Sequence, residues 1–184
     1  MRKCFTSLAL AFVLSAAIAA ATLLAFVSGS YAQTAGESAS GHGTLTRTGA
    51  DGPVKRQFSF SAHVQADGTV TGQAVLINPQ FEGENGNAYQ LHVDISCMKV
   101  VGNIAVFGGT TKRTNDPNLV DAVFFSVQDN GEPGKNRDKI SSVFFWDDDP
   151  TTQGDPQACL LTGAMDFPLE TIEAGNIQVR PSGL

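Results

Sequence analysis

Residues 54–77 read VKRQFSFSAHVQADGTVTGQAVLI, and their alternation decides the fold class. One parity of the first half carries apolar side chains, namely Val54, Phe58, Phe60, Ala62 and Val64. The other parity carries polar ones, namely Lys55, Gln57, Ser59, Ser61 and His63. Alternation with a period of two is typical of a β-strand with one buried face. The pattern predicts a half-buried strand over 54–64 and a second strand over Thr69–Ile77.

Two glycine-containing pairs mark turns between predicted strands. Asp67–Gly68 separates the first two strands, and glycine supplies the positive φ that a two-residue hairpin requires. Gly102–Asn103 is a second pair, with glycine first as a type II′ turn prefers, and the chain returns through Ile104–Gly109. The second strand is expected to end at Asn78–Pro79, because proline has no N–H to donate to a ladder.

The remaining apolar runs complete an all-β pattern. Residues 89–101 alternate, which places Cys97 on the inward face. Leu119–Val127 and Ile140–Trp146 are apolar on both parities, which favours central strands covered on both sides. A closing segment from Cys159 to Arg180 is expected to add one or two strands. The fold class predicted is an antiparallel barrel or two-sheet sandwich of about 8–10 strands. The adjacent glycines 108 and 109 indicate a bulge or a close backbone approach.

The first 32 residues have the features of a signal peptide. A short basic start, Arg2–Lys3, precedes an uncharged run from Cys4 to Val27, and small residues lead to a cleavage site after Ala32. The alternative is that the run stays uncleaved and spans a bilayer, which its length permits. Residues 33–40 are small and polar and predict a flexible tether, and residues 41–184 form a single β domain. We expect a secreted or periplasmic protein that meets a membrane only through an uncleaved leader.

Composition and charge exclude a disordered chain and a nucleic-acid-binding protein. The chain of 184 residues is 42% hydrophobic and 16% charged, as globular proteins are. Without Arg2 and Lys3, ten basic residues oppose 18 acidic ones, a formal charge of −8 for the mature domain. The basic residues are scattered among acids rather than gathered into a stripe that would neutralise phosphates. We therefore expect no nucleic-acid partner.

Two cysteines remain after removal of the leader. Cys97 and Cys159 in a chain sent to an oxidising compartment predict a disulfide. Closing a loop of about 60 residues stabilises a domain by roughly 4 kcal/mol in the chain-entropy model. Two separate buried thiols are the alternative, and a metal site from two cysteines so far apart is not expected.

The histidines offer no catalytic constellation. His42 lies in Gly-His-Gly near the mature terminus, and His63 and His92 fall on the polar parity of their strands. Nucleophilic catalysis needs a base beside an exposed nucleophile, and the chain has no G-x-S-x-G turn. We predict no catalytic residue and interpret each histidine as a solvent-facing strand residue.

One loop has the composition of a cation site. Residues 128–138 read QDNGEPGKNRD, and the carboxylates of Asp129, Glu132 and Asp138 with the amide of Asn136 are hard oxygen donors of the kind that calcium binds. The spacing matches no EF-hand. A long structural hairpin turn would use the same Asp-Asn-Gly and Pro-Gly, so that interpretation stands beside calcium, the one cofactor considered.

Four short segments have a specific combined spacing. They are FSFSA at 58–62, GNIAVFGG at 102–109, VQDNGEPG at 127–134 and GNIQV at 175–179. Together they resemble an uncharacterised secreted bacterial β-domain, sometimes labelled post-COAP-1-like. The resemblance implies an extracytoplasmic, non-catalytic protein and names no ligand, since that family has no established activity.

These observations favour an exported binding or structural module whose partner is an unknown small molecule or protein. A small hydrolase or isomerase working in a barrel mouth with His92, Asp94 or the loop acids is one alternative. A cell-surface adhesion or matrix component is the other, and it predicts an exposed apolar patch or an unpaired edge strand.

Overall fold

The computed structural model describes residues 36–49, 52–82, 88–114, 122–145 and 154–183, which all belong to the compact unit Ala32–Leu184. The predicted leader, residues 1–32, lies outside these ranges. Among the helices of the described ranges, none is long and apolar enough to cross a membrane.

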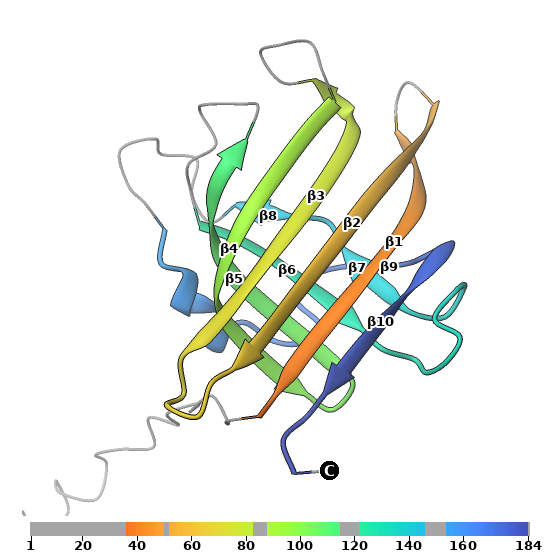
Figure 1. Cartoon of the computed structure of the whole chain (residues 1–184). Coiled ribbons are helices and arrows are strands. Elements are labelled where there is room, and N and C mark those ends of the chain that lie inside the picture. Colours follow the sequence, from red (N-terminus) through yellow and green to blue (C-terminus); the bar gives the residue numbers. More distant parts are fainter. Residues whose placement is uncertain (1–35, 50–51, 83–87, 115–121, 146–153, 184) are drawn as a thin grey trace, which may run out of the picture. The chain divides into compact units, whose positions relative to one another are not determined.

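The described residues form one antiparallel sheet of ten strands (Figure 1). The elements are β1 (Ser38–Gly49), β2 (Gly52–Val64), β3 (Val70–Glu82), β4 (Ala88–Val101), β5 (Ile104–Thr114), β6 (Ala122–Gln128), β7 (Lys139–Ser141), β8 (Phe144–Phe145), the 3-10 helix η1 (Pro156–Leu160), β9 (Leu169–Thr171) and β10 (Ala174–Arg180). The strand order is β10-β1-β2-β3-β4-β5-β6-β7-β9, and β8 also pairs with β6. The predicted all-β antiparallel fold is therefore confirmed.

The sheet folds over into two layers. In Figure 1, β10, β1, β2, β3 and β4 lie in front, and β6 and β7 cross behind them. The ring centroids of Phe60 in β2 and Phe125 in β6 are 5.9 Å apart, although three strands separate these two in the sheet order. Such a contact requires the layers to face each other. The end strands β9 and β10 are not paired with each other, so the sheet is not closed into a barrel.

The space between the layers is packed with aromatic rings. The Phe60 and Phe107 centroids are 5.3 Å apart, and those of Phe107 and Phe125 are 4.7 Å apart. Phe58 stacks beside Phe60 at 6.2 Å. Aromatic residues bury large areas, so this cluster contributes much of the hydrophobic stabilisation. Phe58, Phe60, Ala62 and Val64 are buried and their polar neighbours are exposed, as the alternation in residues 54–64 predicts.

A second, smaller apolar cluster lies on the other face of β6. Val106, Ala122 and Phe124 pack there with Cys97 of β4 and Cys159 of η1. All residues of β6 from Ala122 to Val127 are consequently buried. This confirms that the strand predicted in this region is covered on both faces; residues 119–121 lie outside the described ranges.

A β-bulge changes which residue of β4 enters the main core. Ile95 pairs with Gly109 and Cys97 with Gly108, which leaves Ser96 as the extra residue of the bulge. The bulge shifts the parity by one, so Met98 joins the main core and Cys97 turns to the outer cluster. Cys97 is therefore buried, but on the face of β4 opposite to the one that the alternation predicts, whereas the irregularity predicted at the adjacent glycines is confirmed.

One hairpin agrees with the sequence and one differs. Gly102, with φ of 61°, and Asn103 form the predicted two-residue turn between β4 and β5. The β2–β3 turn is longer than predicted, because Gln65 N donates to Thr69 O and Gly68 N to Gln65 O. Gly68 does adopt positive φ there. Hydrogen bonds from the Thr69 hydroxyl and N–H lower the pKa of Asp67 in this turn.

Two predicted boundaries near the first strands were also wrong. Ser38–Ser40 belong to β1 and pair with both β2 and β10, so they are not part of a tether. Proline 79 lies within β3, where the ladder to β4 breaks after Asn78 and resumes at Glu82. The break removes the need for an N–H at the proline.

The segment after the loop at 128–138 forms two short strands, β7 and β8, where its apolar composition predicts one continuous strand. β7 pairs with Val127 and Gln128, whereas β8 pairs with Val123 and Phe124, and Ser142 and Val143 interrupt them. The region around Cys159 forms η1 rather than a strand, with the Asp155 carboxylate accepting from Gln157 N at its start. The closing strands are β9 and β10.

Candidate functional site

The three histidines lie on the outer face of the front layer. His42 and His63 are exposed and His92 is half-buried. The Nε2 atom of His63 lies 3.2 Å from the Thr71 hydroxyl, and that of His92 lies 3.1 Å from Gln90 Nε2. These partners are neutral side chains, so among the described residues the structure brings none of the histidines to a carboxylate that would orient it as a base. Within the described residues, the predicted solvent-facing role fits the positions of His42 and His63.

The groups of the enzyme alternative have different contacts, although His92 and Asp94 lie two residues apart on the same face of β4. Asp94 forms an exposed ion pair with Lys112, with Oδ2 and Nζ 3.0 Å apart. His92 contacts Gln90, and the acids of the 128–138 loop contact β10, as described below. The arrangement therefore gives these residues separate local roles.

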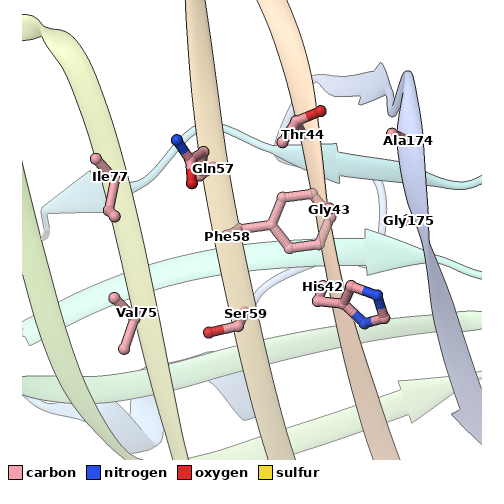
Figure 2. A pocket seen from close by; sticks show the side chains of 10 residues that line it. All are labelled: His42, Gly43, Thr44, Gln57, Phe58, Ser59, Val75, Ile77, Ala174 and Gly175. Carbon is pink, nitrogen blue, oxygen red and sulfur yellow. The ribbon is translucent and has the colours of Figure 1, made fainter.

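A hollow of about 410 Å³ opens on the outer face of β10, β1, β2 and β3. Figure 2 shows His42 and Thr44 of β1 on one side, and Val75 and Ile77 of β3 on the other. Gln57 and Ser59 of β2 lie between them, because Ser59 pairs with both His42 and Val75, and Gln57 with both Thr44 and Ile77. The lining thus combines hydrogen-bonding groups with two aliphatic side chains on regular strands.

The floor of the hollow is formed by small residues above a core ring. A Cβ built on Gly43 would lie 2.9 Å from Cζ of Phe58, so that ring lies directly beneath this glycine. Gly175 of β10 completes the lining. The hydroxyl of Thr44 is buried and has no hydrogen-bond partner in the described part of the chain. The hollow is therefore shallow and lies outside the main core.

The acidic loop at 128–138 packs against the free edge of β10. The N–H of Ile177 donates to Oδ2 of Asp138 at 2.8 Å, and the N–H of Val179 donates to Oδ2 of Asp129 at 3.0 Å. Successive N–H groups of a strand point to opposite sides, so these two point away from β1. Two carboxylates thus take the place of the backbone carbonyls that a neighbouring strand would supply.

The same carboxylates also order their own loop. Asp138 Oδ1 accepts from Asn130 N at 2.8 Å, and Asp129 Oδ1 accepts from Gly131 N at 2.8 Å. Glu132 accepts from the side-chain amides of Asn176 and Gln178 on β10, at 2.7 and 3.1 Å. Asp138 is fully buried. The three predicted calcium ligands are therefore close in the fold, and each one hydrogen-bonds to the loop or to β10.

The calcium interpretation stays a prediction. No group of three or more His, Cys, Asp or Glu side chains in the described ranges is arranged to hold a metal ion. The carboxylates of Asp129, Glu132 and Asp138 already accept hydrogen bonds, and a calcium ion would have to compete with those donors.

Thermal melting tests the calcium prediction. If the loop binds calcium in the folded state only, millimolar calcium raises the melting temperature above that in chelator, since a ligand of the folded state stabilises it. An Asp129→Asn variant is then expected to lose that rise. Equal melting temperatures in calcium and chelator would contradict the prediction and leave the loop with its structural role.

The two cysteines form the predicted disulfide. Cys97 and Cys159 are bonded with a Cα–Cα distance of 6.2 Å, and both are fully buried. The bond joins β4 to η1. Lys99 of β4 also donates from Nζ to the carbonyl of Leu160 in η1 and to that of Thr162, which follows η1. A buried disulfide is typical of proteins from an oxidising compartment outside the cytoplasm.

A cluster of charged side chains lies at one end of the main core. Arg56 lies on the apolar parity of β2, where only 11% of its side chain is exposed. Its Nη1 is 3.5 Å from Glu170 Oε1, and Arg47 Nη1 is 3.7 Å from the same oxygen. Burial lowers the pKa of Arg56, an effect that Glu170 partly offsets. This cluster was not predicted from the sequence, although a charged residue on the same parity as Val54, Phe58 and Phe60 was a signal for it.

Comparison of the chain with protein-family models, with curated proteins and with solved structures found no match. The resemblance to the secreted β-domain therefore stays a prediction. Within the described residues, the fold and the positions just given define the class as an all-β domain with a disulfide.

Proposed function

We propose that this chain is an exported, non-catalytic binding module that contacts its partner through the hollow on the outer face of β1, β2 and β3. The observation that carries the proposal is the lining of that hollow. His42, Gln57 and Ser59 offer donors and acceptors beside the aliphatic Val75 and Ile77 on one rigid sheet. Binding sites combine a few placed polar groups with apolar surface in this way.

Export is the second part of the proposal. The signal peptide over residues 1–32, with cleavage after Ala32, would deliver the domain to the periplasm or the medium. The buried Cys97–Cys159 disulfide supports this destination, since such bonds persist in oxidising compartments. The partner is a small molecule or a protein of neutral or basic character, because the mature domain carries a formal charge of −8.

The packed core supports surface binding over the carriage of a ligand between the layers. The rings of Phe60, Phe107 and Phe125 pack against one another in the centre of the two layers. A protein that carries a ligand between its layers would need this space for the ligand. The outer hollow needs no rearrangement of the core, because the ring of Phe58 lies below its floor.

Filling the hollow tests the proposal. Ser59→Trp places a large side chain at its centre, while Ser61→Trp, two residues along the same exposed face of β2, is the matched control. Tryptophan suits an exposed strand position, so both variants are expected to fold. Tagged wild-type and variant proteins are recovered from the native compartment, and copurifying molecules are identified by mass spectrometry.

We expect at least one component to copurify with wild-type protein and with Ser61→Trp. The recovered amount of that component is expected to fall at least tenfold with Ser59→Trp. Retention of every component by Ser59→Trp would place the contact surface elsewhere and overturn the use of the hollow. Recovery of no component with wild-type protein would contradict a binding module.

A further inference from the structure

The polar cluster at the end of the main core has a composition that suits an anion. Arg47 and Arg56 come from β1 and β2, where Leu45 pairs with Arg56 and Arg47 pairs with Val54. Both arginines are therefore on the parity that faces the other layer, as diagonal neighbours. Ser142 follows β7, and Glu170 of β9 pairs with the buried Ile140. Two cations from the front layer thus meet two polar groups from the back layer.

Both guanidinium groups converge on one neutral oxygen. Arg47 Nη1 donates to Ser142 Oγ at 2.9 Å, and Arg56 Nη1 approaches the same atom at 3.2 Å. The Ser142 hydroxyl in turn lies 3.4 Å from Glu170 Oε1. A hydroxyl oxygen has two lone pairs, so it accepts from both arginines but compensates neither charge.

The carboxylate of Glu170 compensates the arginines incompletely. Its Oε1 lies 3.5 Å from one Nη1 atom and 3.7 Å from the other, longer than the roughly 2.7–2.9 Å of a direct charge-assisted bond. Two positive charges face one negative charge, so the cluster carries a net charge of +1 in a domain that is acidic as a whole. Removing an arginine such as Arg56 from water without full pairing has a cost, which an anionic group that pairs with both arginines at closer range than Glu170 would reduce.

The cluster also has an accessible side. The side chains of Arg47 and Glu170 are 53% and 30% exposed, whereas that of Arg56 is 11% exposed. Within the described part of the chain, the guanidinium of Arg47 contacts only Ser142 and Glu170, although it carries five N–H donors. An anion can therefore approach from the Arg47 side and reach Arg56 behind it.

We propose that Arg47, Arg56 and Ser142 form a binding site for a single oxyanion group, a phosphate, sulfate or carboxylate, which displaces the Glu170 carboxylate. Planar guanidinium groups bind such oxygens in pairs, and two of them on neighbouring strands match one oxyanion. The Ser142 hydroxyl donates to the bound group in place of Glu170. This site lies on the inner face of the sheet and is distinct from the outer hollow.

The test is a titration of the exported domain with sodium sulfate, sodium phosphate and sodium acetate, each at constant ionic strength maintained with chloride. The readout is the chemical shift of the Ser142 amide and of the arginine side-chain N–H groups. Direct shifts are preferable to melting temperature here, because sulfate stabilises folded proteins without binding to a site. We expect saturable shifts with at least one oxyanion and none with chloride. Stronger binding of sulfate and phosphate than of acetate would identify a tetrahedral anion as the ligand, and the reverse order a carboxylate.

Three variants decide the assignment. Arg47→Gln, which leaves the more buried Arg56 in place, is expected to raise the dissociation constant at least tenfold. Glu170→Gln removes the competing carboxylate and is expected to lower the dissociation constant by threefold or more. Arg180→Gln is the matched control, since Arg180 is an exposed arginine on β10 that contacts Gln178. Absence of saturation with all three anions, equal affinity in Arg47→Gln and Arg180→Gln, or weaker binding in Glu170→Gln would each overturn the proposal.

Discussion

Replacing Asp138 by alanine is expected to lower the free energy of unfolding by about 3 kcal/mol. The reason is the position of its carboxylate, which is fully buried and accepts the N–H groups of Ile177 and Asn130 at 2.8 Å each. Alanine leaves both donors without an acceptor, and an unpaired buried N–H costs roughly 1–3 kcal/mol. The loss is concentrated at the edge of β10, where no strand of the described ranges provides replacement carbonyls.

Urea unfolding and amide hydrogen exchange measure this effect. The midpoint is expected to fall by about 1–2 M, and the Ile177 amide is expected to exchange faster than in the wild type. Lys135→Ala is the matched control, because Lys135 is an exposed residue of the same loop. That control is expected to change stability by less than about 0.5 kcal/mol. A change below about 1 kcal/mol in Asp138→Ala would show that the carboxylate does not hold this edge.

Loss of the disulfide has the other large expected effect. A Cys97→Ala, Cys159→Ala double variant is expected to lose about 4 kcal/mol, since the two residues are 62 positions apart and the crosslink restricts the unfolded chain. Alanine also removes two fully buried sulfur atoms from the smaller apolar cluster. Urea unfolding of the double variant against wild-type protein gives the difference.

Thiol titration provides the chemical control. The denatured mature protein is expected to contain no free thiol before reduction and two after it. Two free thiols in the exported, unreduced protein would contradict the disulfide. Reduced wild-type protein and the double variant should then have similar midpoints, and a much more stable reduced protein would show that the alanines, rather than the missing bond, cause the loss.

The local features of the fold were predictable from sequence. The alternation in residues 54–64 and the turn at Gly102–Asn103 depend on neighbouring residues and on backbone geometry, which sequence displays directly. The same is true of β6, whose apolar residues on both parities anticipate cover on both faces. The outer hollow was not predictable as a site, because its lining depends on the register of β10, β1, β2 and β3.

Contacts between residues far apart in the sequence were not predictable. The carboxylate of Asp138 meets the Ile177 N–H across 39 residues, and Arg56 meets Glu170 across 114. The acidic loop displays only its composition, which suits a cation as well as it suits the N–H groups of an edge strand. Likewise, no local pattern shows that Ser96 is the extra residue of a bulge, so the parity of Cys97 was misjudged.

By itself, the sequence was enough to predict a β-sheet protein with a disulfide between Cys97 and Cys159, and the structure confirms both. The export signal over residues 1–32 stays a prediction. Alternation, cysteine count and a leader-like start are all properties of the linear chain. Only the tertiary structure decided the two open layers, the closing of the β10 edge by Asp129 and Asp138, and the meeting of Arg47 and Arg56 with Glu170. The β10 edge depends on which backbone N–H groups lack a partner once the sheet has formed, and the arginine cluster depends on which distant side chains the two layers bring together. Both are properties of the folded chain alone.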